Sequence, residues 1–166
     1  MFNPRILVID DEMIVCESCK RILEEDGYEV ETALSGREAI DKMKENPFDI
    51  VITDLKMPEI DGMEVLRTFR KEYPDTIVIM ITGFSTVETA VEAMKLGAFD
   101  YIPKPFTPDE VSIVVKKAIE KKNLVLEKVL IGFYLLLIDI CKLLIWNRYL
   151  KLKICEKLVK LLKYKK

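Results

Sequence analysis

Short apolar segments alternate with longer amphipathic segments through residues 1–122. The apolar segments are Arg5–Asp10, Tyr28–Ala33, Asp49–Asp54, Thr76–Thr82 and Asp100–Pro103. Three of them contain continuously apolar runs, which are typical of parallel strands buried on both faces, whereas the second alternates as an edge strand does. Five strands that alternate with five helices predict an α/β fold, a doubly wound parallel sheet with helices on both faces.

The segments between the predicted strands carry the signals of helix ends. Ser35–Glu38, Ser85–Glu88 and Thr107–Glu110 match the capping box, in which a hydroxyl and a carboxylate three residues later accept hydrogen bonds from free backbone N–H groups. Gly27 and Gly97 stand where helices should end, because glycine readily adopts the left-handed conformation there. These signals predict the helix boundaries of the sheet domain.

Charge divides the chain into two parts. Of the 26 basic and 28 acidic residues, 10 and 3 lie in residues 123–166, so that this part carries +7 and residues 1–122 carry −9. The 166 residues, half of them hydrophobic, suffice for one globular domain and an appendage. We therefore expect a domain at 1–122 and a helical, apolar and basic extension at 123–166.

The composition restricts the available chemistry. The chain has no histidine, which excludes Ser–His and Cys–His nucleophile pairs, His-ligated zinc and a role as a phosphohistidine donor. Its four cysteines do not form a disulfide framework, and Cys16 and Cys19 resemble a metal or redox pair only superficially. The N-terminus does not resemble a signal peptide, so a cytoplasmic location is expected.

Polar residues stand at the ends of the predicted strands. Asp10 and Asp11 follow the first strand, Asp54 ends the third, Thr82 ends the fourth and Lys104 follows the fifth. Any one of them alone is best explained as a turn or cap residue, and Asp11 could cap the first helix. The carboxyl ends of parallel strands meet at one edge, however, and three carboxylates there repel each other unless a cation intervenes. Oxygen ligands without His or Cys favour Mg²⁺.

Four segments together resemble the response-regulator receiver domain of two-component signalling. They are Ile6–Glu12, Thr53–Gly62, Ile81–Gly83 and Ala98–Phe106. The resemblance covers about residues 4–122 with the expected order and spacing, and Ser85–Gly97 further resembles the receivers of nitrogen-regulation-type, sigma-54-dependent activators. It implies a flavodoxin-like (βα)₅ fold with strand order 2-1-3-4-5.

The resemblance also implies a phosphorylation site. Asp54 would be the phosphoacceptor for a histidine kinase, a phosphotransfer protein or a small acyl phosphate. Asp11, Asp54 and the backbone carbonyl of Lys56 would hold Mg²⁺, and Asp10 would act mainly through water. Such a domain is a switch that catalyses its own phosphorylation and slow dephosphorylation, and not a turnover enzyme.

Further residues would read the phosphoryl group. By the same resemblance, Lys104 and Thr82 would each contact a phosphoryl oxygen, and Tyr101 would turn inward when Thr82 moves. Tyr101 could instead be an ordinary half-buried aromatic residue. The Lys104–Pro105 bond is expected to be cis. The output would be a changed face formed by helix four, strand five and helix five.

Two other functions deserve comparison. A flavin-binding module of similar topology needs a phosphate loop rich in Ser, Thr and Gly after the first strand, where Asp10, Asp11 and Glu12 would repel a phosphate. A phosphatase with an aspartate nucleophile would use Asp54 and Mg²⁺, but it needs an acid two residues later, where this chain has Lys56. Sustained turnover of a phosphate ester would distinguish that enzyme from a switch.

The extension departs from the resembled family. It has neither the phosphate-binding loop of an ATPase domain nor room for a helix-turn-helix domain, so no DNA-binding domain is evident. The 18 residues Val129–Trp146 are borderline as a membrane span, since 12 Val, Leu, Ile and Phe at about −0.3 to −0.6 kcal/mol each roughly offset two central charges. The basic residues that follow would also oppose the positive-inside preference.

The last twenty residues form a basic amphipathic pattern. Leu150, Ile154, Leu158, Leu161 and Leu162 share one helical stripe, with lysines around it. Such a helix can pair with another helix or lie on an anionic membrane surface. We favour a homodimer through this extension over contact of residues 129–162 with a membrane surface, and that contact over a true span. Nucleic-acid binding is the weakest of these hypotheses.

Overall fold

The computed structural model describes residues 4–83 and 86–163, with side-chain surroundings up to Leu143. Its contacts divide the chain into two units, Met1–Glu120 and Lys121–Lys166. The first unit holds the sheet and its helices, and the second continues the last helix.

Five parallel strands form one sheet in the predicted order β2-β1-β3-β4-β5. Their bounds are β1 (Arg5–Ile9), β2 (Glu29–Ala33), β3 (Ile50–Asp54), β4 (Ile77–Thr82) and β5 (Asp100–Pro103). The strand β2 lies at an edge, as its alternating pattern predicts, and its Val30 and Ala33 are buried while Glu29 is exposed. The central strand β3 is buried at every position, because helices cover both of its faces.

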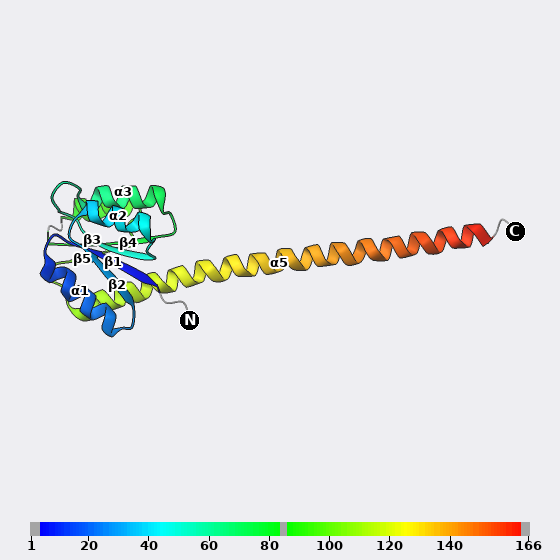
Figure 1. The fold of residues 1–166 in the computed structure, drawn as a ribbon, viewed down its shortest axis with the longest axis horizontal. Helices are drawn as coiled ribbons and strands as arrows, with labels where there is room; N and C mark the ends of the chain where they lie inside the picture. The colour runs from blue at the N-terminus through cyan, green and yellow to red at the C-terminus, as the bar shows by residue number, and fades with distance from the viewer. Residues whose placement is uncertain (1–3, 84–85, 164–166) are drawn as a thin grey trace. The chain divides into compact units, whose positions relative to one another are not determined.

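The helices lie on both sides of the sheet, as Figure 1 shows, with α2 and α3 on one side and α1 with the first turns of α5 on the other. Their bounds are α1 (Met13–Glu25), α2 (Gly36–Glu45), α3 (Gly62–Glu72), α4 (Val87–Lys95) and α5 (Pro108–Lys163). The flavodoxin-like α/β fold expected from the sequence is therefore present.

Successive residues of each strand enter opposite cores. In β1, Leu7 packs in a cluster with residues of α2, α3 and α4, and Val8 packs in a cluster with residues of α1 and α5. The strand β4 repeats this alternation, with Met80 in the first cluster and Ile79 in the second. The two core clusters cover the two faces of the sheet, and polar residues lie at its carboxyl edge.

Most predicted helix ends are confirmed. The Ser35 hydroxyl accepts the backbone N–H of Glu38, and Thr107 and Glu110 exchange the hydrogen bonds of a capping box. Gly27 and Gly97 have φ of +90° and +98° just beyond the ends of α1 and α4. These glycines adopt the conformation that closes a helix.

The predicted start of α4 is wrong by one residue. Thr86 is the N-cap residue, and its hydroxyl accepts the backbone N–H of Thr89 while the Thr89 hydroxyl accepts the backbone N–H of Thr86. Two threonines thus replace the predicted pair of Ser85 and Glu88, of which Ser85 lies outside the described residues. For α1, Glu12 and not Asp11 is the N-cap residue.

In the second unit, residues 124–143 are helical and exposed throughout. Among the described residues, no helix has the length and apolar character needed to cross a membrane. The predicted apolar stripe at Leu150–Leu162 belongs to the helix, but its side chains lie outside the described part.

Candidate phosphorylation and metal site

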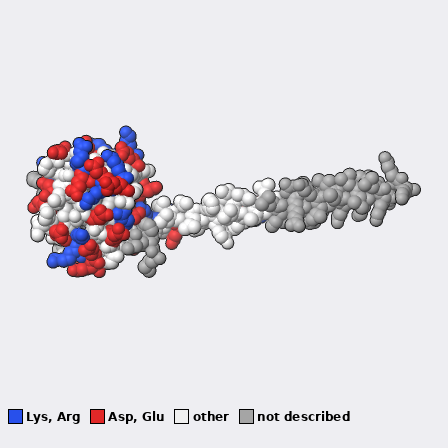
Figure 2. Space-filling view, in the orientation of Figure 1, with Lys and Arg blue, Asp and Glu red and all other residues white. Residues whose placement is uncertain are grey.

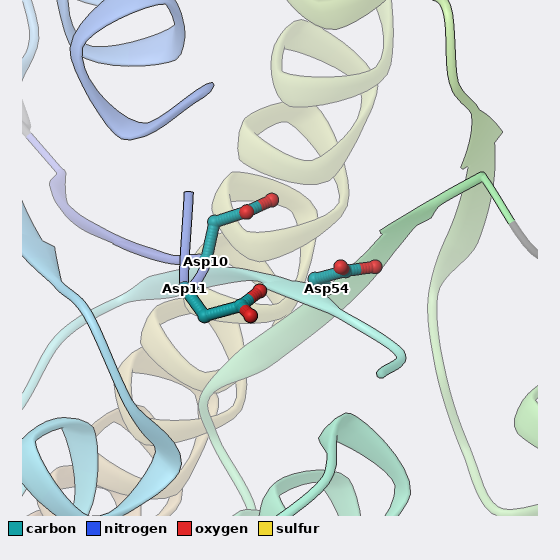
Figure 3. Close-up of side chains that lie close together, drawn as sticks. All are labelled: Asp10, Asp11 and Asp54. Atoms are coloured by element: carbon teal, nitrogen blue, oxygen red, sulfur yellow. The ribbon is translucent and has the colours of Figure 1, made fainter. Parts of the chain in front are cut away.

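Three aspartates meet at the carboxyl edge of the sheet. Asp10 and Asp11 directly follow β1 and Asp54 ends β3, and these strands are neighbours in which Ile9 pairs with Thr53. One carboxylate oxygen of each aspartate lies within 4.8 Å of the others. Figure 3 shows the three side chains together. The sequence therefore predicted correctly that these residues converge.

Asp10 is the most enclosed of the three carboxylates. The residue Asp10 is 1% exposed, Asp54 is 7% exposed, and Asp11 is exposed. Burial raises the pKa of Asp10, a shift that the charge of Asp54 increases and that hydrogen bonds from Lys104 and the Glu12 backbone N–H oppose. A positive charge added near Asp10 would favour its ionised form.

Lys104 joins two of the aspartates. Its Nζ lies 2.7 Å from Asp10 Oδ2, 3.3 Å from Asp54 Oδ2 and 3.7 Å from a carboxylate oxygen of Glu12. Burial alone would lower the pKa of Lys104, but the hydrogen bond and charge of Asp10, together with Asp54, raise it above its usual range. Lys104 is therefore a fixed cation beside Asp54.

The two residues expected to respond to a phosphoryl group lie on β4 and β5. Thr82 ends β4 and is fully buried, and its backbone carbonyl accepts the Lys104 N–H at 2.8 Å. Tyr101 on β5 is half-buried, packs against the core cluster of the α2–α4 side, and its hydroxyl oxygen is buried. The Lys104–Pro105 bond between β5 and α5 is cis, as expected.

The segment after Asp54 is held close to the site by backbone contacts. The Leu55 N–H donates to Asp54 Oδ1 at 2.7 Å, and the Gly62 N–H donates to the Leu55 carbonyl at 2.9 Å. A Cβ at Gly62 would overlap the backbone carbonyl of Asp54, so only glycine fits there. No local sequence pattern marks Gly62 for this role. Lys56, whose carbonyl is an expected ligand, lies in this segment with an exposed side chain.

Of the described cysteines, Cys16 and Cys19 do not belong to the group of three aspartates. Cys16 and Cys19 are buried in the α1 core, where burial raises the pKa of Cys16 to about 11 and of Cys19 to about 12. Both thiols stay protonated at neutral pH and are poor metal ligands and nucleophiles. Cys16 and Cys19 therefore pack in the core on the α1 side of the sheet and do not form a metal or redox pair.

The aspartates form an oxygen-only donor set that fits a hard divalent cation. Three carboxylates with one ammonium leave a net negative charge, and the raised pKa of Asp10 reflects the cost of holding that charge in a buried place. A bound Mg²⁺ would offset this charge. Asp11, the exposed member, would face such an ion from the solvent side.

A family model and several curated proteins match the sheet domain of this chain. The family model described as response regulator receiver domain matches residues 6–116. The transcriptional regulatory protein ZraR of Escherichia coli O157:H7 is 38% identical over 123 residues, which are 74% of this chain and 28% of that protein. The putative NtrX-like response regulator of Rickettsia bellii is 38% identical over 126 residues, 75% of this chain and 26% of that protein. The chain thus spans about a quarter of the length of these curated relatives.

Solved structures show the same relationship. A response regulator receiver domain protein from Clostridium thermocellum superposes with a TM-score of 0.70 at 44% identity, covering 74% of this chain and 98% of that one. The receiver domain of NtrX from Brucella abortus superposes with a TM-score of 0.67 at 34% identity, covering 69% and 98%. The extension lies outside these matches in large part.

Proposed function

The chain belongs to the response regulator receiver domain family of two-component signalling, and on this premise we propose that Asp54 accepts a phosphoryl group in a Mg²⁺-dependent reaction. The main support is the meeting of three carboxylates and the Lys104 ammonium at one edge of the sheet. In this proposal the chain is a switch, with a phosphorylated and an unphosphorylated form.

The reaction uses the Asp54 carboxylate as nucleophile. One of its oxygens forms a bond to phosphorus while the P–N bond of a phosphohistidine breaks and its electron pair leaves on the imidazole nitrogen. With acetyl phosphate, the P–O bond breaks instead and acetate leaves. The Leu55 N–H at 2.7 Å from Asp54 Oδ1 orients the carboxylate.

The surrounding residues neutralise the transferred group. Asp11, Asp54 and the Lys56 carbonyl would hold Mg²⁺, with Asp10 acting mainly through water, and the ion when bound would supply positive charge to the phosphoryl oxygens. Lys104, at 3.3 Å from Asp54 Oδ2, would turn from Asp10 toward a second phosphoryl oxygen.

Thr82 and Tyr101 would convert the chemical change into a change of shape. The Thr82 hydroxyl would donate to a phosphoryl oxygen, and its movement would leave room for Tyr101 on the neighbouring strand. The helices on either side of β5 carry exposed apolar residues, including Val91 and Met94 of α4 and Ile113 of α5. These residues offer a surface on which a partner could distinguish the two forms.

A histidine kinase or a phosphotransfer protein is the proposed donor, and a cytoplasmic location of the chain is part of the same proposal. The relatives ZraR and AtoC are named transcriptional and regulatory proteins, but the chain spans only about a quarter of their length. The activity of those whole proteins therefore does not identify the output of this chain.

The central test is phosphorylation with acetyl phosphate and Mg²⁺. We expect one base-labile phosphoryl group per chain, detected by intact-protein mass spectrometry, and its loss in Asp54→Asn. The matched control is Asp41→Asn, because Asp41 is an exposed α2 residue that pairs with Lys44. Labelling that persists in Asp54→Asn would place the phosphoacceptor elsewhere.

Two alternatives make different predictions. An aspartate-nucleophile phosphatase would release phosphate over many cycles, whereas a switch stops after one phosphoryl group per chain except for slow hydrolysis. A receiver held at a membrane through its extension would bind vesicles in its native state. Lys56, two positions after Asp54, does not supply the acid that the phosphatase needs. No helix among the described residues is long and apolar enough to cross a membrane, and vesicle binding tests contact with a membrane surface.

A further inference from the structure

The second unit exposes an unusual amount of apolar side chain. Fourteen of the residues 124–143 are large hydrophobic residues with exposed fractions between 37% and 69%. Figure 2 shows few charged side chains on the visible face of this stretch. The largest apolar patch on a typical monomer is about 300–600 Å², and a stable interface uses 20–30 residues on each side. A stretch of this length can supply most of one side of such an interface.

The apolar residues follow the spacing of a coiled coil. Leu126, Leu130, Phe133, Leu137 and Ile140 are separated by alternating steps of four and three residues. This is the a/d spacing that keeps one seam of a helix facing its neighbours. We call these five residues the seam.

The side of the helix opposite the seam is the most polar. Lys128 and Lys142 lie two heptads apart at the position farthest from the seam, and Asp139 beside them pairs with Lys142 at 3.5 Å. Both members of this pair are more than 70% exposed. The outer side thus carries these charges together with exposed apolar residues such as Ile131 and Leu135, and the charges indicate that part of this side stays in water.

The apolar stretch itself carries no charge that would draw it to lipid. Residues 124–143 contain Glu127, Lys128, Asp139 and Lys142, so that their net charge is zero, and any attraction of the extension to an anionic membrane surface comes from the basic residues that follow them. The sheet of the same chain already has helices on both faces. A second copy of the seam is the partner whose chemistry matches it.

The width of the apolar surface bears on the number of copies. Val129, Leu136 and Leu143 flank the seam at seven-residue spacing and are 64%, 57% and 69% exposed. In a two-helix coiled coil, such flanking positions stay partly in water and usually carry charges. In a bundle of three or more helices they are buried.

We propose that residues 124–143 assemble copies of this chain into a bundle of three or more helices, in place of the homodimer favoured from the sequence, with the seam inside and Lys128, Asp139 and Lys142 outside. This inference goes beyond the proposed phosphorylation and does not depend on it. The extension would then set how many receiver domains are held together.

The test compares two leucine substitutions in the full chain. Leu137→Glu changes a seam residue, whereas Leu135→Glu makes the same change one heptad from Lys128 and Lys142, on the outer side. Sedimentation equilibrium at micromolar concentration should give a trimer or larger for the parent and for Leu135→Glu. Leu137→Glu should be monomeric, which corresponds to at least a 100-fold weaker association.

Circular dichroism at 222 nm shows whether both variants keep the parent's helix content. A monomeric or strictly dimeric parent would overturn the proposal, as would equal dissociation of the two variants. Recovery of the parent only with phosphatidylcholine and phosphatidylglycerol vesicles would identify lipid as the partner and also overturn it.

Discussion

Three carboxylates of one chemical type have different surroundings in the site. Asp10 is buried and bound to Lys104, Asp54 is almost buried with one oxygen held by Leu55, and Asp11 faces solvent. We infer that Asp10 mainly fixes Lys104, while Asp11 is the residue with a free path to an incoming cation. Their separate roles are therefore testable one residue at a time.

Removal of the Asp11 carboxylate should weaken Mg²⁺ binding. Asp11→Asn takes away one oxygen ligand and one negative charge, so that the dissociation constant should rise by about tenfold or more, which is about 1.4 kcal/mol. Isothermal titration calorimetry with Mg²⁺ measures this change, and Asp41→Asn serves as the control. Unchanged affinity in Asp11→Asn would mean that the ion binds at other residues.

Lys104 and Thr82 should be needed for the response and not for acceptance of the phosphoryl group. We expect Lys104→Ala and Thr82→Ala to be labelled on Asp54 while the amide resonances of α4 and β5 no longer shift on labelling. Lys116→Ala, which changes an exposed lysine of α5, should respond as the parent does. Normal shifts in both site variants would remove these residues from the switch.

The sequence predicts the charged residues of the site better than its glycine. Asp10, Asp54 and Lys104 are evident because polar residues directly follow apolar strands, and parallel topology brings strand ends together. The need for Gly62 arises from a backbone that passes close in space to the Asp54 carbonyl, which no local pattern records. The predicted start of α4 was wrong for a related reason. Ser85 and Thr86 are both good cap residues, and only the path of the chain decides between them.

At the scale of elements, a side-chain contact joins two helices that cover the same face of the sheet. Asp26, the C-cap residue of α1, has its Oδ1 3.1 Å from the Nζ of Lys116 of α5. A hydrogen bond from Ser112 and then the bond and charge of Lys116 lower the pKa of Asp26, while slight burial opposes the shift. The order of strands and helices could be predicted from the sequence. This link between α1 and α5 could not, because it joins residues 90 positions apart.

This link should make a small, pH-dependent contribution to stability. A lowered folded-state pKa means that the contribution is present above the ordinary value of 3.8 and is lost as the pH falls through the folded-state pKa. Asp26→Asn should therefore lower the free energy of unfolding at pH 7 by about 0.5–1 kcal/mol. The difference from the parent should shrink below pH 3.8.

Urea unfolding followed by circular dichroism, at equal protein concentration and at pH 7 and pH 3, measures both values. Asp41→Asn is again the control, because its ion pair lies within one exposed helix. A constant difference between Asp26→Asn and the parent at the two pH values would show that charge is not the cause.

At the scale of the whole molecule, the two units differ in how far sequence defines them. The sheet domain combines strand patterns, caps and a family-wide motif, and each points to the same fold. For the extension, composition predicts a long apolar helix. The sequence of one chain does not show what this helix binds, because that depends on contacts between several molecules. The boundary between the units lies at Glu120 and Lys121 by contacts.

Phosphorylation should depend on the first unit alone. The side chains of Asp54 and Lys104 take their described ion pairs and hydrogen bonds from Asp10, Glu12, Leu55 and each other, all within Met1–Glu120. The solved Clostridium thermocellum receiver, almost all of which this domain matches, indicates that a chain of this extent folds. A chain that ends after Lys122 should be labelled by acetyl phosphate and Mg²⁺ at an initial rate within about twofold of the full chain, because positioning and charge set that rate. Mass spectrometry over a time course measures it at equal chain concentration. Retained helix content with a much slower rate would mean that the extension contributes to the site.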